Sequence, residues 1–212
     1  MVILEKCPIA RPRLHAGGMP VILLLLCGLC LGKDLDRGQW QQPNRVMADL
    51  SAKPGSTVAD VGCGAGYFAF RLSRAVGPAG KVYAVDINAK AVAKLQAEAE
   101  KEHLTNIKTI VSDPRDTKLP FECADLVLIC DVLHEAPKEQ RLPLIKDAVR
   151  ALKPGGFLFL IDYRKSREVP FDPYEKLIPR EDLVKLCEDA GLSLDAEFSY
   201  LKYQVFLRFR KP

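Results

Sequence analysis

The chain has 212 residues, of which 48% are apolar and 27% charged, a composition that fits one globular α/β domain with little room for a second. Its formal net charge of +4 is unevenly placed, because residues 1–33 alone carry +3. The remaining body is close to neutral, which argues against a broad nucleic-acid-binding surface, and we expect no nucleic-acid partner.

The N-terminal region differs in composition from the rest of the chain. Val21–Leu31 is an apolar stretch that follows the basic residues Arg11 and Arg13. A basic region before a short apolar one is typical of a secretory signal peptide, and the stretch is shorter than the roughly 20 apolar residues that span a bilayer. It therefore indicates a cleavable signal or a tether rather than a spanning helix.

These features predict two parts of the chain. Residues 1–38 are expected to be a signal-like or tether segment with a linker, and residues 39–212 a single domain. If the segment is retained, residues 19–32 would associate with a membrane, and we expect the protein at the cytoplasmic face. If it is cleaved as a signal, the protein would be exported. Met19 is an alternative start that would remove the basic flank.

From residue 57 onward strand-like and helix-like segments alternate, as in a sheet with helices on both faces. The predicted strands are Thr57–Val61, Lys81–Asp86, Ile107–Val111, Ala124–Cys130 and Phe157–Tyr163. The predicted helices cover residues 67–76, 88–102, 138–152 and 180–190. Leu192–Tyr200 and Tyr203–Arg210 follow each other so closely that we expect an antiparallel hairpin.

The turn after the first strand is the most informative segment for function. Asp60 stands near the end of the strand, and Gly62, Gly64 and Gly66 follow at alternate positions before a predicted helix. Glycine allows positive φ and has no Cβ, so a ligand can lie against the backbone, and the helix N-terminus offers unpaired N–H groups. The turn predicts a site for a small, partly anionic ligand.

Five segments carry a family resemblance: Asp60–Gly66, Val82–Ile87, the Ser112–Asp113 and Leu119–Phe121 segment, Ala124–His134, and Leu152–Gly156. In this order they resemble the class I S-adenosylmethionine-dependent methyltransferases, especially the small-molecule enzymes related to the ubiquinone and menaquinone C-methyltransferases. The resemblance covers about residues 40–210. It implies an α/β fold with a doubly wound, mostly parallel seven-stranded sheet of order 3-2-1-4-5-7-6, the last strand antiparallel and helices on both faces.

The resemblance implies that S-adenosyl-L-methionine is the cofactor and that a methyl group moves to a small-molecule acceptor. The three glycines would let the backbone approach the methionine part of the cofactor. Asp60 would order this loop and help to hold the ammonium group. Asp86, at the end of the second strand, would accept hydrogen bonds from both ribose hydroxyls.

Three further residues complete the implied cofactor site. Ile87 would pack on the adenine face, Asp113 would accept from the adenine amino group, and Asp131 would face the sulfonium. Asp116 is an alternative to Asp113. The family often has alanine after that acid, whereas Pro114 here lacks an N–H and leaves the local geometry open.

A general base is needed only if the acceptor is a hydroxyl or an acidic carbon. His134, with Glu135, is the best candidate because it follows the fourth strand and should lie at the mouth of the cofactor cleft. Tyr163 and Arg164 end the fifth strand on the same side and are candidates for holding an acceptor's oxygen or acid group. Residues in all three positions have plausible structural roles as well.

Acceptor recognition is expected from segments outside the common core, namely residues 38–43 and 165–179. The sequence does not identify the acceptor or the oligomeric state. A non-catalytic binding protein that kept the fold and is tethered to a membrane remains an alternative function. An arsenite-type methyltransferase is disfavoured, because the seven scattered cysteines do not match its thiolate pattern, and we expect no metal site.

An NAD(P)-dependent dehydrogenase also combines a strand, a glycine turn, a helix and a ribose-binding acid. Its fingerprint requires G-x-G-x-x-G, but here the third glycine comes one residue early and Tyr67 stands where that glycine would be. The acid before the first glycine and the terminal hairpin also count against it. The spacing therefore favours S-adenosylmethionine over a dinucleotide.

Overall fold

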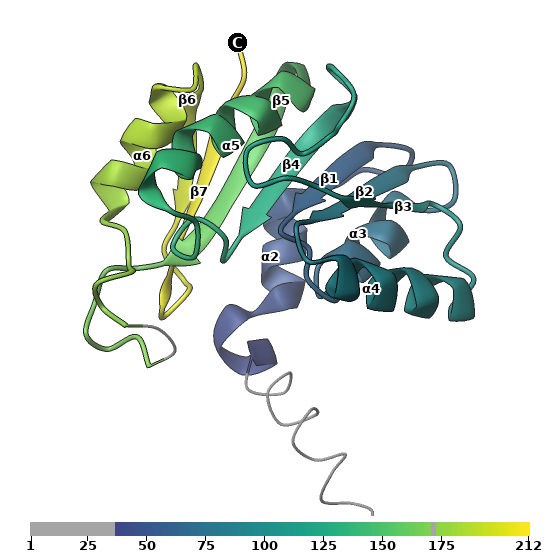
Figure 1. Cartoon of the computed structure of the whole chain (residues 1–212), viewed down its shortest axis with the longest axis horizontal. Coiled ribbons are helices and arrows are strands. Elements are labelled where there is room, and N and C mark those ends of the chain that lie inside the picture. Colours follow the sequence, from purple (N-terminus) through teal and green to yellow (C-terminus); the bar gives the residue numbers. More distant parts are fainter. Residues whose placement is uncertain (1–36, 171–172) are drawn as a thin grey trace, which may run out of the picture. The chain divides into compact units, whose positions relative to one another are not determined.

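A single sheet of order β3-β2-β1-β4-β5-β7-β6 organises the molecule (Figure 1). The computed structural model describes residues 37–170 and 173–212. The strands are β1 (Thr57–Val61), β2 (Lys81–Asp86), β3 (Ile107–Val111), β4 (Ala124–Cys130), β5 (Leu152–Tyr163), β6 (Ser193–Phe198) and β7 (Gln204–Arg210). β1 to β5 run parallel, and β7 is antiparallel to both β5 and β6. The predicted strand order and the antiparallel last strand are confirmed.

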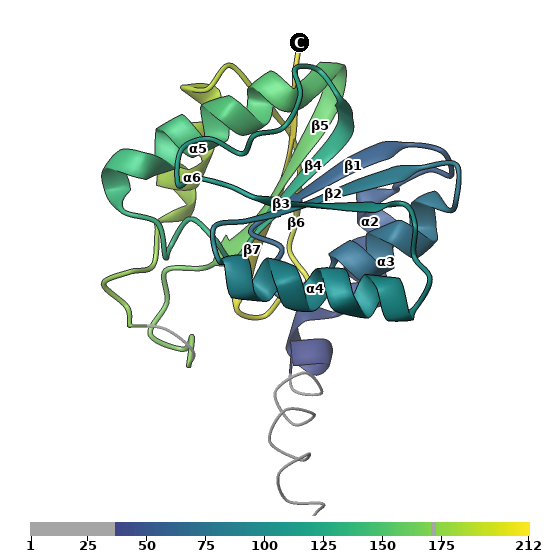
Figure 2. The same cartoon turned by 45° about the vertical axis from the view of Figure 1, so that its right-hand side comes forward.

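Helices cover both faces of the sheet (Figures 1 and 2). They are α2 (Pro43–Leu50), α3 (Ala69–Val76), α4 (Ala89–Lys101), α5 (Lys138–Ala151) and α6 (Arg180–Glu188). Buried residues of α2, α3 and α4 form one apolar core with the sheet, and those of α5 and α6 form a second core on the other face. Because both faces are covered, β4 is apolar at nearly every position.

Several predicted boundaries differ from the structure by one or two residues, and the starts of α3 and β5 differ for structural reasons. α3 begins at Ala69 rather than at residue 67, because residues 62–68 are occupied by successive turns. β5 begins at Leu152 rather than at the predicted Phe157, because residues 152–156 already belong to the strand. Its pairing with β4 has a register shift between Ala124 and Leu126.

The structural unit that carries the sheet extends over Arg37–Pro212. Residues 37–41 are helical, although Arg37 and Gly38 were predicted to belong to a linker. The predicted signal-like segment, with residues 19–32, lies outside the described residues. Within residues 37–170 and 173–212, no helix combines the length and the apolar character needed to cross a membrane.

Candidate functional site

A cavity of about 240 Å³ lies at the carboxyl ends of β1, β2, β3 and β4. Its wall includes Gly62, Asp86, Ile87, Asp113 and Asp131, all of which the sequence predicted for the cofactor site. In open parallel sheets this end is where ligands bind, because successive strands diverge there and leave a crevice. The structure therefore brings residues from four separate segments to one cavity.

The glycine turn and Asp86 are held together by backbone hydrogen bonds. The Gly64 N–H donates to Asp86 Oδ2 at 2.8 Å, and the Asn88 N–H donates to Asp86 Oδ1 at 2.8 Å. Gly62 has a φ of 79° and donates its N–H to the Val85 carbonyl at 2.7 Å. One carboxylate thus fixes both the glycine turn and the start of α4, while each of its oxygens keeps a further lone pair for a ligand.

The glycines differ in the space around them, which leads to a prediction. A Cβ on Gly62 would lie 2.1 Å from Val132 Cγ2, whereas a Cβ on Gly64, at φ 52°, would meet nothing within 4 Å. We expect Gly62→Ala to lower the free energy of unfolding by about 2–6 kcal/mol, from strain plus overpacking. Gly64→Ala should cost only about 1–2 kcal/mol. Urea denaturation of both variants measures this, and equal effects would contradict the assigned crowding.

Asp60 is buried with one oxygen unpaired. It is 3% exposed, and its Oδ2 has no hydrogen-bond partner in the part of the chain that the structure describes. Burial raises the pKa of Asp60 to about 7, and the charge of Asp86 adds to that rise, while Arg37 opposes it. A buried carboxyl with an unused acceptor atom is costly to the protein alone and is suited to a ligand that brings a positive donor.

Arg37 links the helical residues 37–41 to the glycine turn. Its guanidinium lies over the Tyr67 ring at 4.2 Å, and Arg71 lies over the same ring at 4.2 Å. Burial acts to lower the pKa of Arg37, but neighbouring acidic groups, among them the carboxylate of Asp131, outweigh that effect and raise it. Arg37 is therefore a cation held beside the turn by an aromatic face and by a neighbouring carboxylate.

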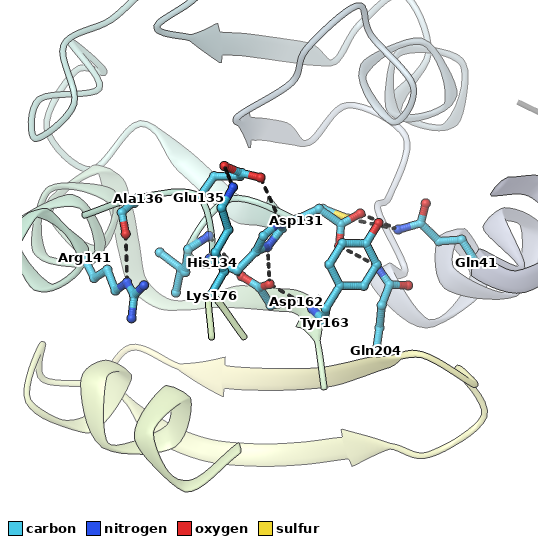
Figure 3. A network of polar contacts seen from close by, with 12 residues as sticks. Gln41, Asp131, His134, Glu135, Ala136, Arg141, Asp162, Tyr163, Lys176 and Gln204 are labelled. Atoms are coloured by element: carbon cyan, nitrogen blue, oxygen red, sulfur yellow. Dashed lines mark hydrogen bonds and ion pairs between the residues drawn. The ribbon is translucent and has the colours of Figure 1, made fainter. Parts of the chain in front are cut away.

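Asp131 is enclosed by donors from both ends of the described chain (Figure 3). Arg37 Nη2 lies 3.1 Å and Gln41 Nε2 3.3 Å from Oδ2, while Gln204 Nε2 donates to Oδ1 at 2.5 Å. Burial raises the pKa of Asp131 to about 6, with Arg37 and Gln204 acting in the opposite direction. Asp131 also has a left-handed φ of 58°, which is unusual for a residue other than glycine.

The predicted adenine contacts lie at the outer part of the cavity. Ile87 is 61% exposed although it follows the buried strand β2, and an apolar side chain exposed at a cavity wall is suited to packing against a flat ring. Asp113 lines the cavity and pairs with Lys118 at 3.2 Å. Its N–H bonds the Asp116 carbonyl, so Asp113 and Asp116 close a small turn with Pro114 between them.

The three residues proposed for catalysis occupy different surroundings. His134 is only 5% exposed and lies against Asp162, so it is Glu135, rather than His134, that lines the cavity. Tyr163 packs with its ring 5.0 Å from the His134 ring and 5.9 Å from Trp40. Arg164 donates through Nη2 to the carbonyls of Leu201 and Gln204, 3.1 Å each, and so ties down the turn before β7.

Arg37, Asp162 and Gln204 were missed by the sequence reasoning, and Gln41 was included only as part of the 38–43 segment expected to recognise the acceptor. Gln41, Asp162 and Gln204 are polar and at most 1% exposed. Asp162 carried a readable signal, since it stands near the end of β5 as Asp60 and Asp86 do in β1 and β2. The others bond Asp131 across more than 70 residues of sequence, which no local pattern reveals.

Within residues 37–170 and 173–212, no three His, Cys, Asp or Glu side chains are grouped to hold a metal ion. Cys63, Cys130 and Cys187 are buried and reduced, and Cys123 is partly buried. Burial raises the pKa of each of these thiols, so they behave as small apolar side chains.

The site has the features that S-adenosylmethionine requires. Gly62 contributes backbone without a side chain to the cavity wall, Asp86 offers two carboxylate oxygens, and the unpaired oxygen of Asp60 suits an ammonium donor. Ile87 offers an apolar surface at the far end. The sheet order together with this cavity defines the class of protein: an α/β methyltransferase.

Comparisons with known proteins agree with this class. Residues 58–156 match the family model described as a methyltransferase domain. A solved S-adenosylmethionine-dependent methyltransferase from Aquifex aeolicus is 28% identical with a TM-score of 0.78, covering 85% of this chain and 96% of that one. The chain is therefore similar to the class I S-adenosylmethionine-dependent methyltransferases, and these similarities support S-adenosyl-L-methionine as its cofactor.

Two curated relatives have different acceptors in their names. A demethylmenaquinone methyltransferase of Staphylococcus aureus is 35% identical over 121 residues, covering 56% of this chain and 47% of the relative. An arsenite methyltransferase of Halobacterium salinarum is 30% identical over 119 residues, covering 56% of this chain and 30% of the relative. The chain thus spans less than half the length of either relative.

Proposed function

We propose that the protein transfers the methyl group of S-adenosylmethionine to a small organic acceptor at the carboxyl edge of the sheet. The observation that carries the proposal is the cavity in which Gly62, Asp86 and Ile87 meet Asp131. Its volume of about 240 Å³ is below the roughly 300–1,000 Å³ of most ligand pockets, which suits the nucleoside half of the cofactor.

In this proposal the nucleoside lies along β2. Asp86 accepts hydrogen bonds from the two ribose hydroxyls through the lone pairs not used by Gly64 and Asn88. Ile87 packs on the adenine face, and Asp113, whose carboxylate also pairs with Lys118, accepts from the adenine amino group. The charge-assisted bonds to Asp86 are expected to contribute most of the affinity.

The amino-acid end of the cofactor lies beyond the three glycines, between Asp60 and Arg37. Asp60 accepts from the ammonium group through its unpaired Oδ2, and the Arg37 guanidinium faces the carboxylate. This arrangement is supported by charge, because two buried carboxyls, Asp60 and Asp131, flank a single arginine. Binding of a sulfonium and an ammonium would favour the ionised form of both acids.

The bound cofactor supplies a methyl group already activated by its positive sulfur. The protein therefore contributes alignment and exclusion of water, which together account for roughly 7–11 kcal/mol in well-oriented reactions. Asp131, at the end of β4 in the cavity wall, places a negative charge on the sulfonium side. The acceptor would approach from the side of residues 38–43 and the 165–179 segment.

Cofactor-dependent stability tests this proposal directly. We expect S-adenosylhomocysteine, at about 100 times its dissociation constant, to stabilise the full chain by about 2.7 kcal/mol, which raises the unfolding midpoint by roughly 5–11 °C. Differential scanning calorimetry measures the shift. NAD⁺ at the same concentration is the control and should give no change. A shift with NAD⁺, or none with S-adenosylhomocysteine, would contradict the proposal.

A further inference from the structure

Asp162 and His134 form a buried pair beside the cavity (Figure 3). Asp162 Oδ1 lies 2.6 Å from His134 Nδ1 and accepts the Tyr163 N–H at 2.8 Å. Asp162 Oδ2 accepts the N–H groups of Leu133 at 2.9 Å and of His134 at 3.2 Å. Three backbone donors and the imidazole thus occupy all of the acceptor positions of this carboxylate, which is 1% exposed.

These contacts fix the proton on one ring nitrogen of His134. Since every other group that bonds Asp162 is a donor, the carboxylate acts as an acceptor, and Nδ1 of His134 carries the proton between them. Proton uptake by the ring therefore falls to Nε2. Nε2 lies 3.7 Å from Glu135 Oε1, and Glu135 lines the cofactor cavity.

Glu135 connects the buried pair to the side from which an acceptor arrives. Its other oxygen, Oε2, lies 2.9 Å from Lys176 Nζ, which belongs to the 165–179 segment. A neutral imidazole nitrogen and a carboxylate at 3.7 Å both present lone pairs, so a proton placed between them is favourable. Glu135 and His134 together form a place where a proton released in the cavity is stabilised.

We propose that Asp162, His134 and Glu135 form a proton relay that serves an aromatic hydroxyl acceptor. The inference rests on the proposed methyl transfer. The acceptor oxygen forms a bond to the methyl carbon as the carbon–sulfur bond breaks. The electron pair of the broken carbon–sulfur bond stays on sulfur. The hydroxyl proton passes to Glu135 and from there to Nε2 of His134. Asp162 is a positioning residue, and the products are a methyl ether and S-adenosylhomocysteine.

The acidity of the acceptor's hydroxyl group favours an aromatic over an aliphatic acceptor. An imidazole has an ordinary pKa near 6.5 and a phenol one near 10, so full proton transfer is unfavourable by roughly 10³–10⁴-fold. A hydroxyl as weakly acidic as water, with a pKa near 15.7, would make the same transfer unfavourable by roughly 10⁹-fold. Only the pKa difference between a phenol and an imidazole is small enough for a general base of this kind to assist the transfer.

An aromatic surface adjoins the relay. The Tyr163 ring contacts the His134 ring at 5.0 Å, and Trp40 contacts Tyr163 at 5.9 Å and Tyr203 at 6.3 Å. Trp40 and Tyr203 are partly exposed and pack on the same small cluster. Offset or edge contacts with such rings favour a flat aromatic molecule.

Several charged or titratable groups surround His134 and belong in any account of its pH dependence: Asp162 and Tyr163 from β5, Asp131 from the end of β4, Glu135 beside it, and Lys176 through Glu135.

The tautomer of His134 can be measured without an acceptor. Long-range ¹H–¹⁵N NMR of the ¹⁵N-labelled full chain reports which nitrogen of each imidazole is protonated. The chain has His15, His103 and His134, so His134→Asn assigns the signals. The exposed residue His103, at φ 57°, allows His103→Asn as a matched control, because asparagine tolerates this backbone.

The relay predicts the Nδ1–H tautomer for neutral His134, with a second proton added at Nε2 on acidification. Asp162→Asn should abolish that tautomer preference. If neutral His134 in the wild type carries its proton on Nε2, the relay is overturned. This readout does not depend on turnover, so it separates the relay from the proposed methyl transfer, which is tested by S-adenosylhomocysteine binding.

Turnover tests the acceptor class. Tritiated methyl transfer from S-adenosylmethionine is measured to 2-naphthol and to 2-naphthylmethanol, which present the same ring with an aromatic or an aliphatic hydroxyl. We expect 2-naphthol to be methylated and 2-naphthylmethanol not. His134→Asn and Glu135→Gln should lower kcat by about 10²–10⁴-fold and remove the acid limb of the pH profile. His134 does not line the cofactor cavity, so His134→Asn should leave S-adenosylhomocysteine affinity unchanged. Methylation of both alcohols alike, or full activity in both variants, would overturn the proposal.

Discussion

The Asp86→Ala variant is expected to bind S-adenosylhomocysteine roughly 10²–10⁴-fold more weakly than the wild type, because two charge-assisted hydrogen bonds to ribose contribute about 1.5–3 kcal/mol each. Asp86 also accepts the N–H groups of Gly64 and Asn88, so the change loosens the glycine turn before any ligand arrives. Isothermal titration calorimetry measures the affinity.

Two further variants make this result interpretable. Asp86→Asn keeps one oxygen that accepts a backbone N–H, so its affinity should lie between those of the wild type and Asp86→Ala. Asp195→Ala removes a carboxylate of β6 that pairs with Arg208 on the outer hairpin, and it should bind normally. Unaltered affinity in a folded Asp86→Ala protein would show that the ribose is held elsewhere.

Asp60→Asn is expected to stabilise the unliganded protein at pH 8 while weakening cofactor binding. Burial raises the pKa of Asp60 to about 7 from an ordinary value of 3.8. Above pH 7 the Asp60 carboxylate is charged in both states, but in the folded state that charge is buried away from water, at a cost on the order of 4 kcal/mol. The amide carries no such charge, but it also gives the ammonium group a weaker partner.

The pH dependence distinguishes this explanation from a general packing effect. As pH falls from 7 towards 4, the folded wild type takes up a proton at Asp60 before the unfolded chain does, so its stability rises relative to Asp60→Asn. Urea denaturation at pH 8, 6 and 5 should show the two proteins converging. The affinity of the wild type for S-adenosylhomocysteine should decrease as the pH is lowered below 7. The affinity of Asp60→Asn should depend less on pH. A difference in stability that is constant with pH would refute the assignment.

Much of the fold could be predicted from local patterns in the sequence. Alternating strands and helices and the close pair of terminal strands predicted the layered α/β fold and the hairpin, while the sheet order and the antiparallel β7 came from the family resemblance. Asp86 and Ile87 could be placed at the cavity because they follow a strand that borders β1. The hairpin and the strand-end positions depend on neighbours in the sequence or on strand ends that meet at one edge, whereas the sheet order depends on the resemblance of five segments to a known family.

The contacts around Asp131 and His134 were beyond such reasoning. Arg37 stood in a segment that read as a polar linker, and Gln204 stands in a strand whose other early residues are apolar, with nothing to indicate that both bond Asp131. His134 was expected at the mouth of the cleft, but Asp162 draws its ring inward, so Glu135 takes that place. These positions are set by tertiary packing rather than by periodicity.

The position of β7 between β5 and β6 bears on how the chain matures on the ribosome. β6 has no partner in the sheet until β7 has been inserted, and Asp131 lacks Gln204 until the same moment. A nascent chain that stops before residue 204 would therefore expose the unpaired edge of β5. An exposed strand edge of this kind promotes aggregation. Insertion of β7 therefore both covers the edge of β5 and provides the Gln204 hydrogen bond to Asp131 in the cavity wall.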